Sequence, residues 1–176
     1  MATYLAFLRA INLGARRRFG KDDLAAAVER AGFTEVATHL NTGNVRLVST
    51  LRSTARVEEV LETAFLADRG FEVPTIVLTP GELAEVVADA ETLADGHAGK
   101  QFVSLLKEAP APEAIERFEQ LSTPDEQARV RGRAVHLLLG ESYHQARLTN
   151  AVVEKHLGVA TNRNLTVLRT LAERWG

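Results

Sequence analysis

The 176-residue sequence predicts an α+β protein built from two small units. Two patterns carry this prediction: apolar residues alternate with polar ones in several short runs, as in strands, and recur every three or four positions in others, as in helices. Hydrophobic residues make up 45% of the chain and charged residues 25%, the balance of a globular protein with a buried core. A chain of this length fits one medium domain or two small ones, so the order of the elements decides between them.

The first half of the chain predicts six elements. A loop with two glycines and three consecutive arginines ends the first apolar run. Gly32 and Gly70 mark the ends of the two segments with helical spacing, and Asn41–Asn44 suits a hairpin turn. The expected elements are a strand at 4–9, a helix at 22–31, strands at 36–40 and 45–48, a helix through 57–65 and a strand at 73–78. This β-α-β-β-α-β order is that of the ferredoxin-like fold, with right-handed crossovers.

A second, smaller α+β unit is expected to follow, so the predicted division is 1–79 and 80–176. Thr79 and Glu82 form a capping box around Pro80, which opens a helix. The Gly132-Arg133 pair fits the tight turn of an antiparallel hairpin. The remaining expected elements are a buried strand at 102–106, a helix holding Ile115 and Phe118, and two terminal helices, one at 150–157 and the last with Thr161 or Asn162 as its N-cap.

Composition excludes several classes of chemistry. Cysteine is absent, which removes disulfides, thiolate nucleophiles and cysteine-type zinc sites, and the five histidines are too scattered for a metal motif. No glycine pattern of a nucleotide or dinucleotide site is present, so no cofactor is expected. The formal net charge of −2 disfavours nucleic acid as a partner. With no secretory leader and no apolar run of about 20 residues, we expect a cytoplasmic protein without a membrane span.

Eight residues are candidates for a ligand site, because they lie in loops rather than on helix faces. Backbone amides before a helix, together with arginine side chains, suit an anion such as phosphate or carboxylate. The alternatives for the same residues are a solvated basic loop, ordinary turn chemistry and helix capping. The candidates are Arg9, Asn12, Gly14, Gly43, Asn44, Lys155, Arg163 and Asn164.

Four segments carry a resemblance to a known family. They are Phe7–Gly14, Leu40–Val45, Glu154–Gly158 and Thr161–Asn164. With these motifs in this order, the chain resembles the bacterial family called domain of unknown function 1697. The resemblance implies a ferredoxin-like first subdomain and a second α+β subdomain, and it implies no established activity.

The functional hypothesis that follows is a module that binds a small anionic ligand between its two units through the candidate residues. One alternative is an enzyme that acts on a phosphate-bearing small molecule, although no catalytic residue can be nominated. Another is an RNA-binding or protein-interaction module that uses the arginine loop or a sheet edge.

Overall fold

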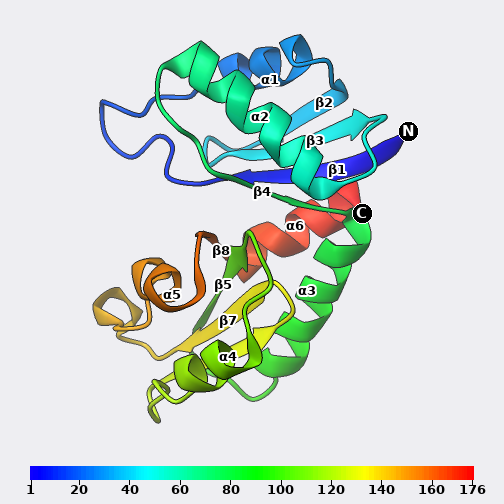
Figure 1. Ribbon diagram of the computed structural model, residues 1–176. Coiled ribbons are helices and arrows are strands. Elements are labelled where there is room, and N and C mark those ends of the chain that lie inside the picture. The colour runs from blue at the N-terminus through cyan, green and yellow to red at the C-terminus, as the bar shows by residue number, and fades with distance from the viewer. The chain divides into compact units, whose positions relative to one another are not determined.

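The computed structural model describes residues 1–176. The chain divides into two compact units, one of residues 1–82 with Trp175 and one of residues 83–174 with Gly176 (Figure 1). No helix combines the length and the apolar character needed to cross a membrane.

The first unit has the expected ferredoxin-like fold. Its four strands form one antiparallel sheet in the order β2-β3-β1-β4, and α1 and α2 lie on one face of this sheet (Figure 1). The β-α-β-β-α-β order predicted from the sequence is therefore confirmed. The elements are β1 (Ala2–Leu8), α1 (Lys21–Arg30), β2 (Thr34–His39), β3 (Asn44–Ser49), α2 (Thr54–Arg69) and β4 (Thr75–Leu78).

Alternation along β1 explains how this unit builds its core. Tyr4, Ala6 and Leu8 point to the helix-covered face and are almost fully buried in one apolar cluster. Phe65 of α2 joins the same cluster and meets Phe19 edge-to-face, with the ring centroids 5.2 Å apart. The loop before α1, which contains Phe19, is thereby fixed to the core.

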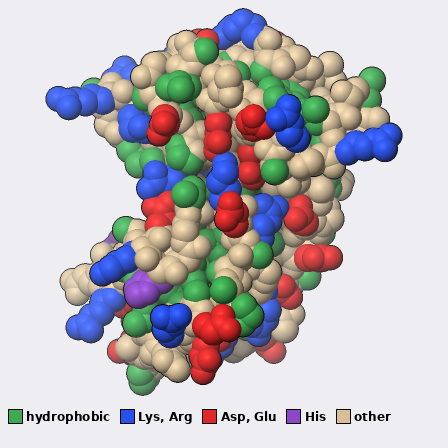
Figure 2. Space-filling model, viewed as in Figure 1, with side chains coloured by type: hydrophobic (Ala, Val, Ile, Leu, Met, Phe, Trp, Pro, Cys, Tyr) green, Lys and Arg blue, Asp and Glu red, His purple; other side chains and the backbone are tan.

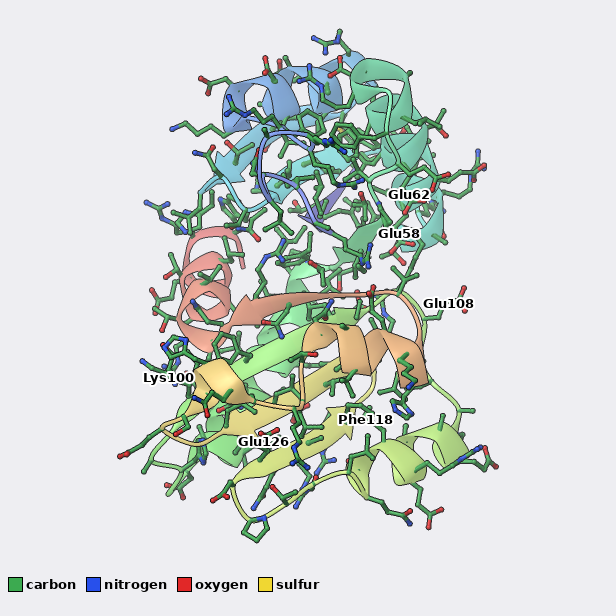
Figure 3. The ribbon with its side chains drawn as sticks, turned by 90° about the vertical axis from the view of Figure 1, so that its left-hand side faces the viewer. Glu58, Glu62, Lys100, Glu108, Phe118 and Glu126 are labelled. Atoms are coloured by element: carbon green, nitrogen blue, oxygen red, sulfur yellow. The ribbon has the colours of Figure 1, made fainter.

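Two glutamates of α2 bind the outer edge of the short strand β4. The backbone N–H of Val77 donates to Glu58 Oε1 and that of Thr75 to Glu62 Oε1, both at 2.9 Å. Figure 3 shows the two labelled glutamates on the same helix. The outward N–H groups of β4 therefore find their partners within the unit.

Helix α3 (Pro80–Ala94) begins with the predicted capping box. The Thr79 N–H donates to Glu82 Oε2 at 2.8 Å, and the Glu82 N–H donates back to Thr79 Oγ1 at 3.2 Å. These two reciprocal bonds satisfy donors that a helix N-terminus otherwise leaves open.

The second unit repeats the β-α-β-β-α-β order of the first. Its strands form an antiparallel sheet in the order β6-β7-β5-β8, which matches β2-β3-β1-β4 strand for strand. The elements are β5 (Lys100–Leu106), α4 (Pro112–Glu119), β6 (Glu126–Arg131), β7 (Ala134–Leu139), the short 3₁₀ helix η1 (Tyr143–Gln145), α5 (Asn150–Leu157), β8 (Ala160–Asn164) and α6 (Leu165–Trp175).

Backbone contacts recur at equivalent places in the two units. The Leu8 N–H donates to Gly43 O in the first unit, and the Leu106 N–H donates to Arg133 O in the second, both at 2.8 Å. The residue after that donor makes a second equivalent bond, to the residue just before the last strand of its unit. The Arg9 N–H donates to Pro74 O in the first unit, and the Lys107 N–H donates to Val159 O in the second, both at 2.9 Å. The two halves are therefore one topology used twice.

The prediction for the end of the chain was wrong in one respect. The segment after Gly158 is strand β8, which pairs with β5, and the N-cap of α6 is Asn164 rather than Thr161 or Asn162. Its Oδ1 accepts from the Val167 N–H at 2.8 Å. Because four of the five residues in β8 are polar or charged, the strand lacks the apolar alternation that reveals the others.

Helices α3 and α6 are additions to the ferredoxin-like plan of the second unit. Gln101 of β5 donates through Nε2 to Ala90 O of α3 at 3.0 Å, so α3 covers the sheet face opposite to α4 and α5. Arg169 of α6 pairs with Glu91 of α3 at 2.9 Å. These contacts join α3 to one face of the second sheet and α6 to α3.

Candidate functional site

Asn12 organises the loop between β1 and α1. Its Nδ2 donates to Phe19 O at 2.9 Å and to Asn41 O at 2.6 Å, while its Oδ1 accepts from the Phe19 N–H at 2.7 Å. Its backbone has a φ of 55°, a left-handed conformation that asparagine tolerates better than most residues. The side chain is thus used within the loop and ties it to the β2–β3 hairpin.

The three consecutive arginines have different roles. Arg17 donates through Nε to Ala10 O and through Nη2 to Glu72 O, both at 2.7 Å, and its guanidinium lies 4.7 Å from the centre of the Phe71 ring. Arg16 and Arg18 are exposed. The middle arginine is structural, and only its two neighbours face solvent.

Gly43 and Asn44 are explained by the geometry of the hairpin. Gly43 has a φ of 77°, and a Cβ atom at this position would lie 2.7 Å from Leu8 Cβ. Asn44 is fully buried, and its Nδ2 donates to His39 O at 3.0 Å and to Thr42 Oγ1 at 2.9 Å. Turn chemistry therefore accounts for both residues.

The other two candidates of the first unit lie at the same end of β1. Arg9 is half-buried, and its backbone N–H donates to Pro74 O at 2.9 Å. Gly14 is exposed at the tip of the loop, with a φ of 78° and open space around it. The structure thus brings the five candidates of this unit into two adjoining loops.

The three candidates of the second unit do not form one cluster. Arg163 is only 8% exposed, and its Nη1 donates to Thr161 Oγ1 and Asn162 O, both at 2.8 Å. Burial lowers the pKa of Arg163 to about 10, which leaves the guanidinium charged at neutral pH. Asn164 caps α6, whereas Lys155 is exposed on α5.

The sheet separates Lys155 from Arg163. Asn162 donates to Ser104 Oγ, which in turn donates to Asn150 Oδ1 of α5, so Asn162 faces that helix. The next residue, Arg163, points to the opposite face because side chains alternate along a strand. The predicted convergence of the first-unit and second-unit candidates on one ligand stays a prediction.

A hollow that the sequence did not reveal lies where α6 begins, with a volume of about 350 Å³. Register places Phe102 of β5 opposite Asn164 of β8, so the start of β5 adjoins the N-terminus of α6. Figure 3 shows Lys100 at this end of the sheet. The main polar and aromatic residues of the lining are His97, Lys100, Gln101, Tyr143, Asn164 and Arg169.

The hollow is electropositive. Lys100 and Arg169 are both exposed at its rim, and the first turn of the eleven-residue helix α6 adds the positive end of a helix dipole. Glu91 offsets part of this charge by pairing with Arg169 Nε at 2.9 Å. The Asn164 side chain caps the Val167 N–H, and the preceding residues of the first turn, Leu165 and Thr166, line the hollow.

Gln101 is a lining residue whose buried side chain carries an unsatisfied acceptor. Its side chain is 8% exposed and its Nε2 is engaged by Ala90 O, but its Oε1 accepts no hydrogen bond from the protein. A buried polar atom without a partner costs about 1–3 kcal/mol, so such atoms are uncommon unless they have another use.

His136 on β7 is a second buried polar side chain without a partner. It is fully buried, and neither ring nitrogen has a hydrogen-bond partner. Burial is the main cause that lowers the pKa of His136 to about 4. The charge of Asp89 raises this pKa by a smaller amount, and that of Arg131 lowers it further. No group of three or more His, Cys, Asp or Glu side chains is placed to hold a metal ion.

Comparison with known proteins identifies a family and a fold. The structure resembles that of the conserved bacterial protein SP0830 from Streptococcus pneumoniae, with a TM-score of 0.77 and 21% sequence identity over 99% of this chain and 98% of that chain. At this identity the likeness shows the fold alone. No curated protein matches the chain. The model of the family described as "Protein of unknown function (DUF1697)" matches residues 1–136, and the chain therefore belongs to this family, as its sequence motifs predicted.

Proposed function

We propose that the chain binds a small anionic ligand in the hollow at the N-terminus of α6. The observation that carries the proposal is the cationic rim of this hollow, where Lys100, Arg169 and the first turn of α6 meet beside the buried side chain of Gln101. Asn164 is common to this hollow and to the candidates predicted from the sequence. Participation of the other seven remains a prediction, which the Lys155→Gln and Arg9→Gln variants described below test for two of them.

The cationic rim suits a phosphate, sulfate or carboxylate group. Backbone N–H groups at a helix N-terminus point toward an anion, and the helix dipole favours negative charge there. Lys100 supplies a flexible ammonium group, and Arg169 supplies a guanidinium with donors beyond the Nε that pairs with Glu91. The volume of about 350 Å³ lies near the lower end of small-molecule sites.

The wall of the hollow adds a second requirement. A ligand that carries a hydroxyl or amine donor near its anionic group would satisfy Gln101 Oε1 once this buried atom turned toward the hollow. Phe102 and Tyr143 form an aromatic wall, with ring centroids 6.0 Å apart, against which the carbon skeleton of such a ligand can pack.

The test uses two probes on the full chain, sulfate and glycerol 3-phosphate, with affinity measured by calorimetry and thermal shift. Lys100→Gln and Arg169→Gln should each weaken both probes about tenfold, as expected for loss of a charge-assisted hydrogen bond. Gln101→Leu should weaken glycerol 3-phosphate by several-fold and leave sulfate unchanged, because sulfate has no donor at neutral pH.

Lys155→Gln is the matched control, since it removes an exposed cation outside the hollow. Unchanged affinity in this variant supports the hollow. Absence of binding of both probes to the wild-type chain, or equal losses in the Lys155, Lys100 and Arg169 variants, would refute the proposal. A loss confined to Lys155→Gln and Arg9→Gln would favour the site predicted from the sequence instead.

A further inference from the structure

Two of the most exposed large hydrophobic side chains of the protein lie in adjoining loops of the first unit. Leu13 is 71% exposed in the loop before α1, and Leu40 is 51% exposed in the β2–β3 hairpin. Scattered exposed leucines need no explanation, but neighbouring ones in built loops do.

A hydrogen bond joins the two loops at the residues next to these leucines. Asn12 Nδ2 donates to Asn41 O at 2.6 Å, and each leucine is the direct chain neighbour of one of the bonded residues. The Lys21 N–H also donates to Asn41 Oδ1, at 3.3 Å. The two loops are therefore tied together beside both leucines.

The two loops are rigidly built. The Asn12 N–H donates to Arg17 O at 2.7 Å and closes the Leu13–Arg16 excursion, while Arg17 is held by Ala10 O and Glu72 O. Ile11 and Phe19 anchor the two ends of the loop in the core. The exposed leucines are thus held in place by the scaffold and do not result from a loose loop.

Leu40 is held outward at an energetic cost. Its φ of 59° is a left-handed conformation that a leucine adopts only with strain, and glycine or asparagine would relieve this strain. A strained, exposed and apolar residue has no evident benefit for folding. Such residues gather at sites of binding.

Charge complementarity indicates the partner. Arg16 and Arg18 are exposed in the same loop, and Figure 2 shows basic side chains projecting from the left edge of the first unit, with hydrophobic and acidic side chains beside them. None of these exposed leucine and arginine side chains is aromatic, and the Phe71 ring beside the loop already stacks with Arg17, whereas single-stranded nucleic acid is usually held by base stacking on aromatic rings. An acidic protein segment with apolar side chains matches both its charge and its leucines.

We propose that Leu13, Leu40, Arg16 and Arg18 form a docking surface for an acidic peptide segment that carries leucine-type side chains. The leucines supply apolar contact, and the arginines supply orientation and attraction. Because this surface and the hollow at α6 share no residue, the two proposals stand or fall separately.

The experiment measures binding of a labelled peptide of about twelve residues, with leucine at every third or fourth position and glutamate elsewhere, to the full chain by fluorescence anisotropy. A peptide with serine in place of leucine is the control probe. Leu13→Gln and Leu40→Asn should each weaken binding at least fivefold, whereas Leu66→Gln, which alters a leucine that is 45% exposed elsewhere in the unit, should not.

Leu40→Asn has a second expected effect that a merely structural role would not produce. Its melting temperature should stay equal to that of the wild type or rise by a few degrees, because asparagine tolerates the left-handed backbone. Equal binding of the serine peptide, equal losses in Leu66→Gln, or a lower melting temperature of Leu40→Asn would overturn the proposal. Tighter binding of oligouridine than of the peptide would show that the partner is RNA. Self-association that Leu40→Asn abolishes would show that the partner is a second copy of the chain.

Discussion

Acidification should destabilise the protein through His136. This side chain is fully buried on β7, and burial lowers its pKa from 6.5 to about 4 in the folded state. In the unfolded chain the imidazole regains its ordinary pKa, so the unfolded state binds more protons between these two values. The stability linked to this group is therefore complete above pH 6.5, falls as the pH drops, and stops changing below about pH 4.

The magnitude follows from the difference between the two pKa values. Each pKa unit corresponds to about 1.4 kcal/mol, so His136 alone should reduce the free energy of unfolding by about 3 kcal/mol across this window. Asp89 of α3 acts in the opposite direction and Arg131 of β6 in the same direction as burial, and both are already included in that value. Such a loss is a large part of the stability of a typical small domain.

Urea unfolding at a series of pH values measures this effect, and His136→Leu isolates it. The leucine variant has no buried imidazole and should show a flatter stability profile between pH 4 and 6.5, whereas His144→Gln, which alters an exposed histidine of η1, should follow the wild type. An NMR titration in which the His136 ring resonances shift with a midpoint near pH 6.5 in the folded protein would refute the reasoning. So would identical pH profiles of the wild type and His136→Leu.

Three further substitutions test the loops and the cap by urea unfolding. Gly43→Ala should lower the free energy of unfolding by about 2–4 kcal/mol, because the new Cβ would clash with Leu8 and the φ at this position is positive. Gly14→Ala has a similar φ but open space around it, so it should lower the free energy of unfolding by about 1 kcal/mol. Equal losses in the two variants would contradict the close-contact explanation. Asn12→Ala should cost about 2–3 kcal/mol through loss of the bonds to Phe19 and Asn41, and a neutral result would show that the loop does not depend on them. Asn164→Ala should cost about 1 kcal/mol as the loss of a helix cap, measured against Thr166→Ala as an exposed control in the same turn.

The fold could be predicted from the sequence wherever a segment carries a short apolar run, strand-like alternation or a helical stripe of apolar residues. Such segments gave the elements of the first unit and the hairpin of the second, and Thr79 and Glu82 gave the start of α3. Strand β8 was missed because most of its side chains are polar or charged. Arg163 is buried in it, which lowers the pKa of this arginine, and Asn162 is hydrogen-bonded to Ser104 on the side of α5. The repeated topology depends on this strand, so the sequence shows only a loosely similar order of elements in the two halves.

The candidate site was harder to predict than the fold. The residues that stood out, such as Asn12, Gly43 and Asn44, did so because their loops need them for backbone geometry. The hollow at α6 draws on separate stretches of the chain that only the β5–β8 pairing brings together, and neither Lys100 nor Arg169 belongs to a motif. No spacing rule within the sequence relates such residues.

The glutamates that bind the last strand of each unit have a consequence for solubility. A free strand edge can recruit the strand of another molecule, which is a common route to aggregation. In the first unit Glu58 and Glu62 occupy the outward N–H groups of β4, and in the second Glu154 of α5 accepts the Ala160 N–H of β8 at 3.0 Å. In each unit, a glutamate from the helix before the last strand therefore hinders pairing of that edge strand with a strand of another molecule.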